Sequence, residues 1–144
     1  MATLSLTRAN RIISQAFAHA AKEGYKPLAC IVLDAGGNIK AFQSQDGASI
    51  GRYAVAGGKA RGALATGLGT RWLNAQAETR PHFLAGINSV IEGGVVPVPG
   101  GVLARDKSGN IVAAIGISGD MSDADEACAV AACEAVNLIA DTGA

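Results

Sequence analysis

Apolar residues recur at steps of three and four between Ser5 and Glu23, a spacing that places one buried stripe along a helix. Gly24 follows directly and predicts the end of that helix. The apolar pattern then changes. Two short apolar runs, from Leu28 to Leu33 and from Ile39 to Gln43, flank a turn with a glycine pair, which predicts a β-hairpin.

The hairpin pattern returns further along the chain. Apolar runs from Val102 to Arg105 and from Ile111 to Ser118 flank the turn sequence D-K-S-G-N, which predicts a second hairpin. Between the hairpins, helical patterns cover Ser49 to Leu68, Thr70 to Gln76 and Pro81 to Ile91. This order predicts an α/β (α+β) fold in which helices cover an antiparallel β-sheet of at least four strands.

A last helix is predicted to begin at Ser122, in the stretch S-D-A-D-E-A-C-A. Ser122 and Asp125 have the spacing of a capping box, and acidic side chains in the first turn suit the positive end of the helix dipole. No stretch has the composition of a linker or of a low-complexity segment. We therefore expect residues 1–144 to form a single domain.

Composition indicates a core of small side chains. Hydrophobic residues make up 49% of the chain, but only one Trp, two Tyr and three Phe are present. Gly57 and Gly58 lie within a predicted helix, where each glycine costs about 1 kcal/mol relative to alanine, so we expect a close contact there. Cys30, Cys128 and Cys133 lack CxxC spacing, which favours reduced core thiols over disulfides or a zinc site.

Charge and hydropathy restrict the partners. Lysine plus arginine and aspartate plus glutamate each total 12, so no net field favours nucleic acid or an anionic membrane. No apolar run reaches the roughly 18 residues of a membrane span, and the sequence does not start with the charged-then-apolar order of a signal peptide. We expect a cytoplasmic protein whose partner is neither a nucleic acid nor a membrane.

The two histidines are the first candidates for reactive chemistry. His19 lies at the edge of the apolar stripe of the first helix, and His82 follows Pro81 at the start of a later helix. Either could ligate a metal or haem iron, or act as an acid or base. The alternative for each is a boundary or surface histidine with no special role. HxH and HExxH motifs are absent from the sequence, which argues against a preformed transition-metal site.

Charged side chains and glycine-rich turns are the other candidates. Arg52 and Lys59 are seven residues apart on one predicted helix, hence on one face, where they form a solvated basic face or hold a carboxylate. Asp120 lies where a strand becomes a helix. It either forms the turn or belongs to a binding pocket, and in a pocket it could act as an acid or a base. The segment from Gly93 to Asp120 is rich in glycine and is interpreted as a pocket wall whose turns offer backbone N–H groups. Its proposed ligand-binding glycines are Gly100, Gly101 and Gly119.

Several motifs together resemble one family. The chain contains D-A-G-G-N, R-Y-A-V-A-G-G-K-A-R-G-A-L, R-P-H-F, V-P-V-P-G-G-V-L and G-I-S-G-D-M-S-D-A-D-E-A-C-A. In this order they resemble the GlcG/HbpS-like family, which includes the C-terminal domain of PduO-type proteins. The likeness covers nearly the whole chain, and the last two motifs are the specific ones.

The resemblance implies a profilin-like sandwich, with an antiparallel sheet of four to five strands, and homo-oligomers of up to eight subunits. Some members of the family bind haem, and others have no settled activity. By resemblance, His19 lies in the helix region that supplies a haem-iron ligand in some members. Arg52, Lys59, Gly119 and Asp120 match positions of the family motifs.

Three functions are therefore open from the sequence. The first is an oligomeric protein that binds a small molecule, with haem or another tetrapyrrole as the ligand. The second is a small catabolic enzyme that acts on a carboxylate-bearing metabolite such as a hydroxy acid, with Arg52 and Lys59 holding the carboxylate and Asp120 as acid or base. The third is a structural subunit without a ligand. Alanine-rich helices that can pack closely suggest the third.

Overall fold

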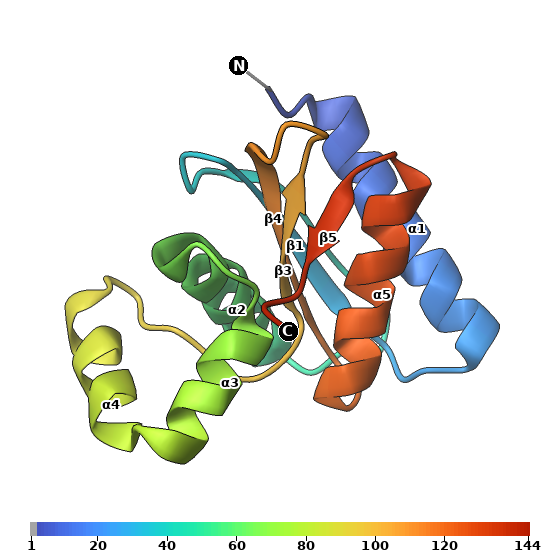
Figure 1. The fold of residues 1–144 in the computed structure, drawn as a ribbon. Coiled ribbons are helices and arrows are strands. Elements are labelled where there is room, and N and C mark those ends of the chain that lie inside the picture. The colour runs from blue at the N-terminus through green and yellow to red at the C-terminus, as the bar shows by residue number, and fades with distance from the viewer. Residues whose placement is uncertain (1–2) are drawn as a thin grey trace.

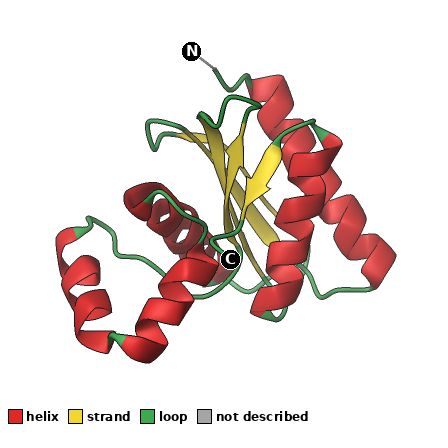
Figure 2. Cartoon of the chain, viewed as in Figure 1, coloured by secondary structure: helices red, strands yellow, loops and turns green. Residues whose placement is uncertain are grey.

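The computed structural model describes residues 3–144 and contains helices on both sides of a single sheet (Figures 1 and 2). In chain order the elements are α1 (Leu6–Glu23), β1 (Ala29–Asp34), β2 (Ile39–Ser44), α2 (Arg52–Thr66), α3 (Thr70–Thr79), α4 (Pro81–Val90), β3 (Gly101–Arg105), β4 (Ile111–Ser118), α5 (Ser122–Ala135) and β5 (Ile139–Asp141). Both predicted hairpins and all five predicted helices are present, so the predicted α+β class is confirmed.

The sheet has the strand order β2-β1-β4-β3-β5, and every neighbouring pair is antiparallel. The two hairpins join through β1 and β4 at the centre, where Ile31 pairs with Gly116. The turns of the two hairpins are built alike. In each, the first aspartate of the turn, Asp34 or Asp106, accepts hydrogen bonds from two backbone N–H groups, and these bonds lower the pKa of both carboxyl groups.

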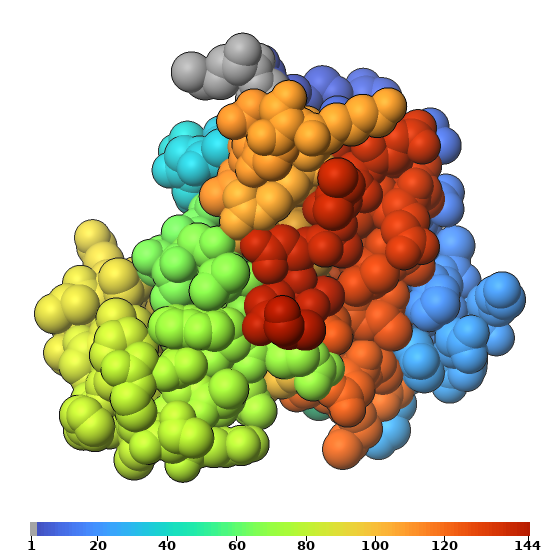
Figure 3. All heavy atoms as spheres, in the orientation of Figure 1, coloured from blue at the N-terminus to red at the C-terminus, as the bar shows by residue number. Residues whose placement is uncertain are grey.

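Helices cover the two faces of the sheet unequally. α1 and α5 pack on one face and enclose the larger core cluster, whereas α2 packs on the other face over a smaller cluster (Figure 1). α3 and α4 form a lobe that projects beside α2 (Figure 3), and α4 has no buried residue. Among the described residues, no helix combines the length and the apolar character of a membrane span.

The ends of α1 follow from local sequence signals. Ser5 Oγ accepts a hydrogen bond from the backbone N–H of Arg8 at 3.1 Å, which caps the first turn. Gly24 ends the helix with a φ of 73°, a left-handed conformation that glycine adopts without steric cost. Both features are visible in the sequence, and the predicted helix is confirmed to within one residue.

The predicted capping box of α5 is wrong. The N-cap residue is Met121, and no side chain caps the helix. The Asp125 carboxylate points into the protein instead, where it meets Lys59. The helix ends at Ala135, and the chain then forms β5 at the edge of the sheet.

The three cysteines lie in the core, as predicted. Cys30 on β1 and Cys128 and Cys133 on α5 are fully buried and belong to the same core cluster. Burial raises the pKa of all three thiols, so they are neutral at physiological pH. Neutral buried thiols act as small apolar side chains rather than as nucleophiles or metal ligands.

Candidate functional site

Lys59 lies in the interior rather than on the surface of α2. Only 2% of its side chain is exposed, and Nζ donates hydrogen bonds to Asp125 Oδ2 at 3.0 Å and to the backbone carbonyl oxygen of Ile117 at 2.8 Å. Burial lowers the pKa of Lys59 and raises that of Asp125, while the attraction between the two charges opposes both shifts. The ammonium group therefore joins α2 to β4 and α5, and ligand binding by Lys59 stays a prediction.

Arg52 and Asp120 lie near the same end of β4. Arg52 Nη1 donates to Ser118 Oγ at 3.4 Å. The Asp120 carboxylate accepts hydrogen bonds from the backbone N–H groups of Lys26, at 2.8 Å, and of Met121, at 2.7 Å. These bonds lower the pKa of Asp120, so at neutral pH it is a carboxylate that can accept a proton but has none to donate.

The glycines of the proposed pocket wall support close packing. A Cβ atom on Gly101 would overlap the backbone carbonyl of Lys59, and one on Gly119 would overlap the carbonyl oxygen of Pro27. Gly100 has a φ of 121°, and its carbonyl oxygen accepts from Ile117 N. The N–H of Gly101 donates to Thr70 Oγ1 at 2.9 Å. These backbone groups are bonded within the protein, and ligand contact by the three glycines stays a prediction.

The two histidines lie in different surroundings. His19 is half-buried on α1, with its ring edge-on to Tyr25 at a centroid separation of 6.2 Å. His82 is exposed on α4, in the projecting lobe. No described residue donates to or accepts from a nitrogen of the His19 ring. Within residues 3–144, no three His, Cys, Asp or Glu side chains gather in a way that could hold a metal ion.

Tyr25 also belongs to a shallow groove next to α1. The groove has a volume of about 560 Å³, and Phe17, Pro27 and the end of β2 form its other walls. His19 is not among its lining residues. Tyr25 thus connects the half-buried imidazole with an open surface that is wide enough for a small molecule.

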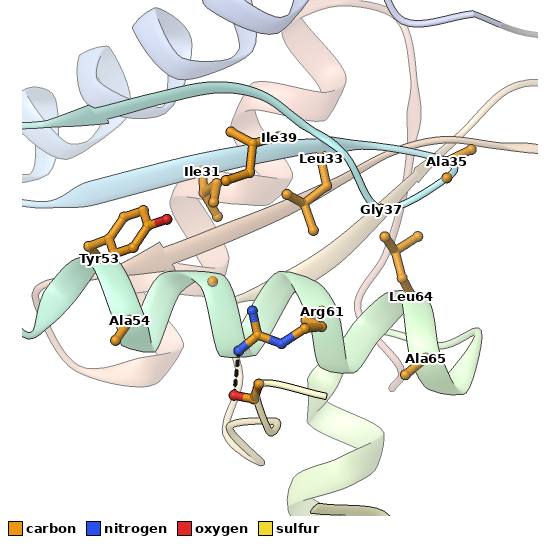
Figure 4. Close-up of a pocket in the computed structure, with 13 residues that line it drawn as sticks. Ile31, Leu33, Ala35, Gly37, Ile39, Tyr53, Ala54, Arg61, Leu64 and Ala65 are labelled. Atoms are coloured by element: carbon orange, nitrogen blue, oxygen red, sulfur yellow. Dashed lines mark hydrogen bonds between the residues drawn. The ribbon is translucent and has the colours of Figure 1, made fainter. Parts of the chain in front are cut away.

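A second cleft, of about 580 Å³, lies between α2 and the β1–β2 hairpin. Figure 4 shows Ile31, Leu33 and Ile39 of the hairpin across from Tyr53, Arg61 and Leu64 of α2. The volume is in the range of small-molecule sites, and the mixture of apolar walls with one charged group is typical of them. Of the segment interpreted as a pocket wall, Gly93 lines this cleft.

Sequence reasoning missed the two polar residues of this cleft. Tyr53, Gly57 and Arg61 are spaced at i, i+4 and i+8 on α2 and so share one face. That periodicity was available in R-Y-A-V-A-G-G-K-A-R, but Arg61 had no separate role in the analysis of the sequence. The charged pair singled out there, Arg52 and Lys59, does share one face of α2, and this face packs toward β4.

Comparisons with known proteins agree on the fold. The family described as "Haem degrading protein HbpS-like" matches residues 4–134. A double mutant of HbpS from Streptomyces reticuli is 29% identical, with a TM-score of 0.80 over 94% of this chain and 88% of that one. The PduOC:haem complex is 26% identical, with a TM-score of 0.83 over 94% and 96%. Protein ORFY of Klebsiella pneumoniae, 21% identical over 92% and 90% with a TM-score of 0.81, is similar in fold. No curated protein matches the sequence.

Proposed function

The chain belongs to the HbpS-like family, and from this membership we propose that it binds haem or a related tetrapyrrole, with His19 as the ligand of the iron. The observation that carries the proposal is His19 itself. It is half-buried on α1, and no described residue makes a hydrogen bond to its ring nitrogens. One relative of similar fold along 94% of this chain has been solved as a haem complex.

The residues around His19 fit such a ligand. A neutral imidazole nitrogen is a common ligand of haem iron, and the Tyr25 ring beside it offers an aromatic surface. Lys22 is exposed three residues further along α1, on the same side of the helix, where its ammonium can pair with a propionate. When bound, the haem would supply an iron centre for redox or ligand-binding chemistry.

Titration with hemin tests this proposal. The wild-type protein is expected to give a shifted, saturable Soret band, and His19→Ala to weaken hemin binding at least about tenfold through loss of the iron ligand. His82→Ala is the matched control, because it removes an exposed histidine from another helix, and its titration should coincide with that of the wild type. An unchanged band in the His19 variant would contradict the assignment.

We further infer that the binding form is a homo-oligomer. Three large apolar side chains are strongly exposed on the single chain: Ile50 at 98%, Met121 at 76% and Val90 at 75%. Burying such side chains against another protein surface would be favourable, and a homo-oligomer supplies that surface from a second copy of the chain.

Light scattering measures the assembly directly. At micromolar concentration we expect a mass of at least two chains, and Ile50→Asp is expected to shift the population toward smaller species, because it places a charge at an interface. A wild-type mass equal to that of one chain would contradict the inference.

A further inference from the structure

The cleft between α2 and the β1–β2 hairpin contains one positively charged side chain in a fixed position. Arg61 Nε donates to the carbonyl oxygen of Gly94 at 2.9 Å, and Nη2 donates to that of Gly93 at 2.8 Å. The dashed line in Figure 4 marks the bond to Gly93. Two bonds to one turn hold the planar guanidinium in place, so little conformational freedom would be lost when a ligand binds to it.

The remaining nitrogen, Nη1, faces Gly57. A Cβ atom added to Gly57 would lie 3.6 Å from Arg61 Nη1, with no other atom within 4 Å beyond its own helix backbone and chain neighbours. Gly57 lines the cleft, so the missing side chain leaves open space next to Nη1. Among the described residues, no acceptor forms a hydrogen bond with Nη1. Its donors are therefore available to a ligand.

The charge of Arg61 is not neutralised locally. None of the thirteen residues that line the cleft is an aspartate or a glutamate, and no carboxylate of the described chain forms an ion pair with Arg61. The side chain is half-buried next to apolar walls. A cation in such surroundings attracts an anion more strongly than one in water does, and a guanidinium is suited to a carboxylate.

We propose that this cleft binds a small monocarboxylate with an apolar body. The carboxylate accepts hydrogen bonds from Arg61 Nη1, and the body lies against Ile31, Leu33 and Leu64. Tyr53, held edge-on by Phe42 at a centroid separation of 4.8 Å, closes one end of the cleft. The site lies on the opposite face of the sheet from α1 and His19 (Figure 1), so it is separate from the proposed haem site.

The experiment uses 4-phenylbutyrate as the probe and 4-phenylbutyramide as its uncharged control. Each is titrated into haem-free, full-length protein, and binding is followed by calorimetry and by amide chemical shifts. The carboxylate is expected to bind with a millimolar or lower dissociation constant, to shift amides of α2 and of the β1–β2 turn, and to bind at least about tenfold more tightly than the amide.

Two variants test the two parts of the site independently. Arg61→Gln removes the charge, and Gly57→Leu fills the space beside Nη1 while keeping the arginine. Each is expected to weaken 4-phenylbutyrate binding at least about tenfold. Leucine favours a helix more than glycine does, so weaker binding by Gly57→Leu would not result from a loss of helix stability. Arg11→Gln, an exposed arginine on α1, and His19→Ala should bind like the wild type.

Several results would overturn the proposal. The proposal is wrong if 4-phenylbutyrate does not bind at millimolar concentration, or if 4-phenylbutyramide binds as tightly as 4-phenylbutyrate does. It is also wrong if Gly57→Leu binds 4-phenylbutyrate as tightly as the wild type does. Chemical shifts confined to residues outside α2 and the hairpin would also overturn it. Failure of hemin to bind would leave this result untouched, because the titration contains no haem.

Discussion

Replacing Lys59 with methionine is expected to lower the free energy of unfolding by about 3–5 kcal/mol, the cost of leaving one partner of a buried ion pair uncompensated. Methionine keeps most of the apolar part of the lysine side chain, so loss of packing contributes little to this cost. The variant loses the bonds from Nζ to Asp125 and to the Ile117 carbonyl, and the Asp125 carboxylate stays in a site with 2% side-chain exposure. Urea denaturation at pH 7 and equal protein concentration measures the loss.

The pH dependence separates this cause from a simple packing defect. Burial already raises the pKa of Asp125, and removal of the nearby ammonium raises it further. The folded variant therefore holds a proton on Asp125 at pH values where the unfolded chain has lost it. The difference in unfolding free energy between the wild type and the variant should therefore shrink as the pH falls toward the ordinary pKa of an aspartate. It should grow as the pH rises.

A surface arginine provides the matched control. Arg71 pairs with Asp123 and Glu126, but 37% of its side chain is exposed. Arg71→Met is expected to cost about 1 kcal/mol or less, as is usual for exposed pairs. If Lys59→Met cost no more than Arg71→Met, the buried pair between α2 and α5 would not contribute as the structure indicates.

The ends of α1 could be predicted from the sequence and the role of Lys59 could not, because the residues that interact are close in sequence in the first case and distant in the second. The cap at Ser5 and the stop at Gly24 depend on neighbours within four residues, and so do the aspartate turns of both hairpins. Lys59 and Asp125 are 66 positions apart. A lysine on a helix and an aspartate in a first helical turn each have an ordinary local explanation, and only the packing of α2 against β4 and α5 brings them together.

The cleft could not be predicted from the sequence either, because its walls come from segments that are distant along the chain. Its polar face follows the helical period of α2, but its apolar wall comes from the β1–β2 hairpin, and the turn that holds Arg61 lies 32 positions further along. His19 was found because histidine is a rare and reactive residue type. Arg61 has no such distinction among the twelve lysines and arginines of the chain, and its fixed orientation appears only in the folded protein.

Gly116→Ala is expected to destabilise the protein by about 3 kcal/mol, in the upper range for an overpacked core. α2 crosses the sheet above Gly116 so closely that a Cβ atom there would overlap the backbone carbonyl of Ala56, and it would lie 3.0 Å from the Ala60 side chain. Gly101, its cross-strand partner on β3, is equally confined by the backbone of Lys59. Backbone groups cannot rotate away as a side chain can, so α2 would have to move as a unit.

Gly57→Ala is the matched control on the opposing helix. Its Cβ atom would meet only Arg61 Nη1, at the ordinary contact distance of 3.6 Å, and alanine favours a helix by about 1 kcal/mol over glycine. This variant should therefore be more stable than the wild type in urea denaturation, whereas Gly116→Ala should be less stable. Of the glycine pair, Gly58 makes the close contact that the sequence predicts, because its Cβ would lie 2.6 Å from Val96 Cγ2, whereas Gly57 does not. A Gly116→Ala loss below about 1 kcal/mol would mean that α2 does not pack this closely on β4.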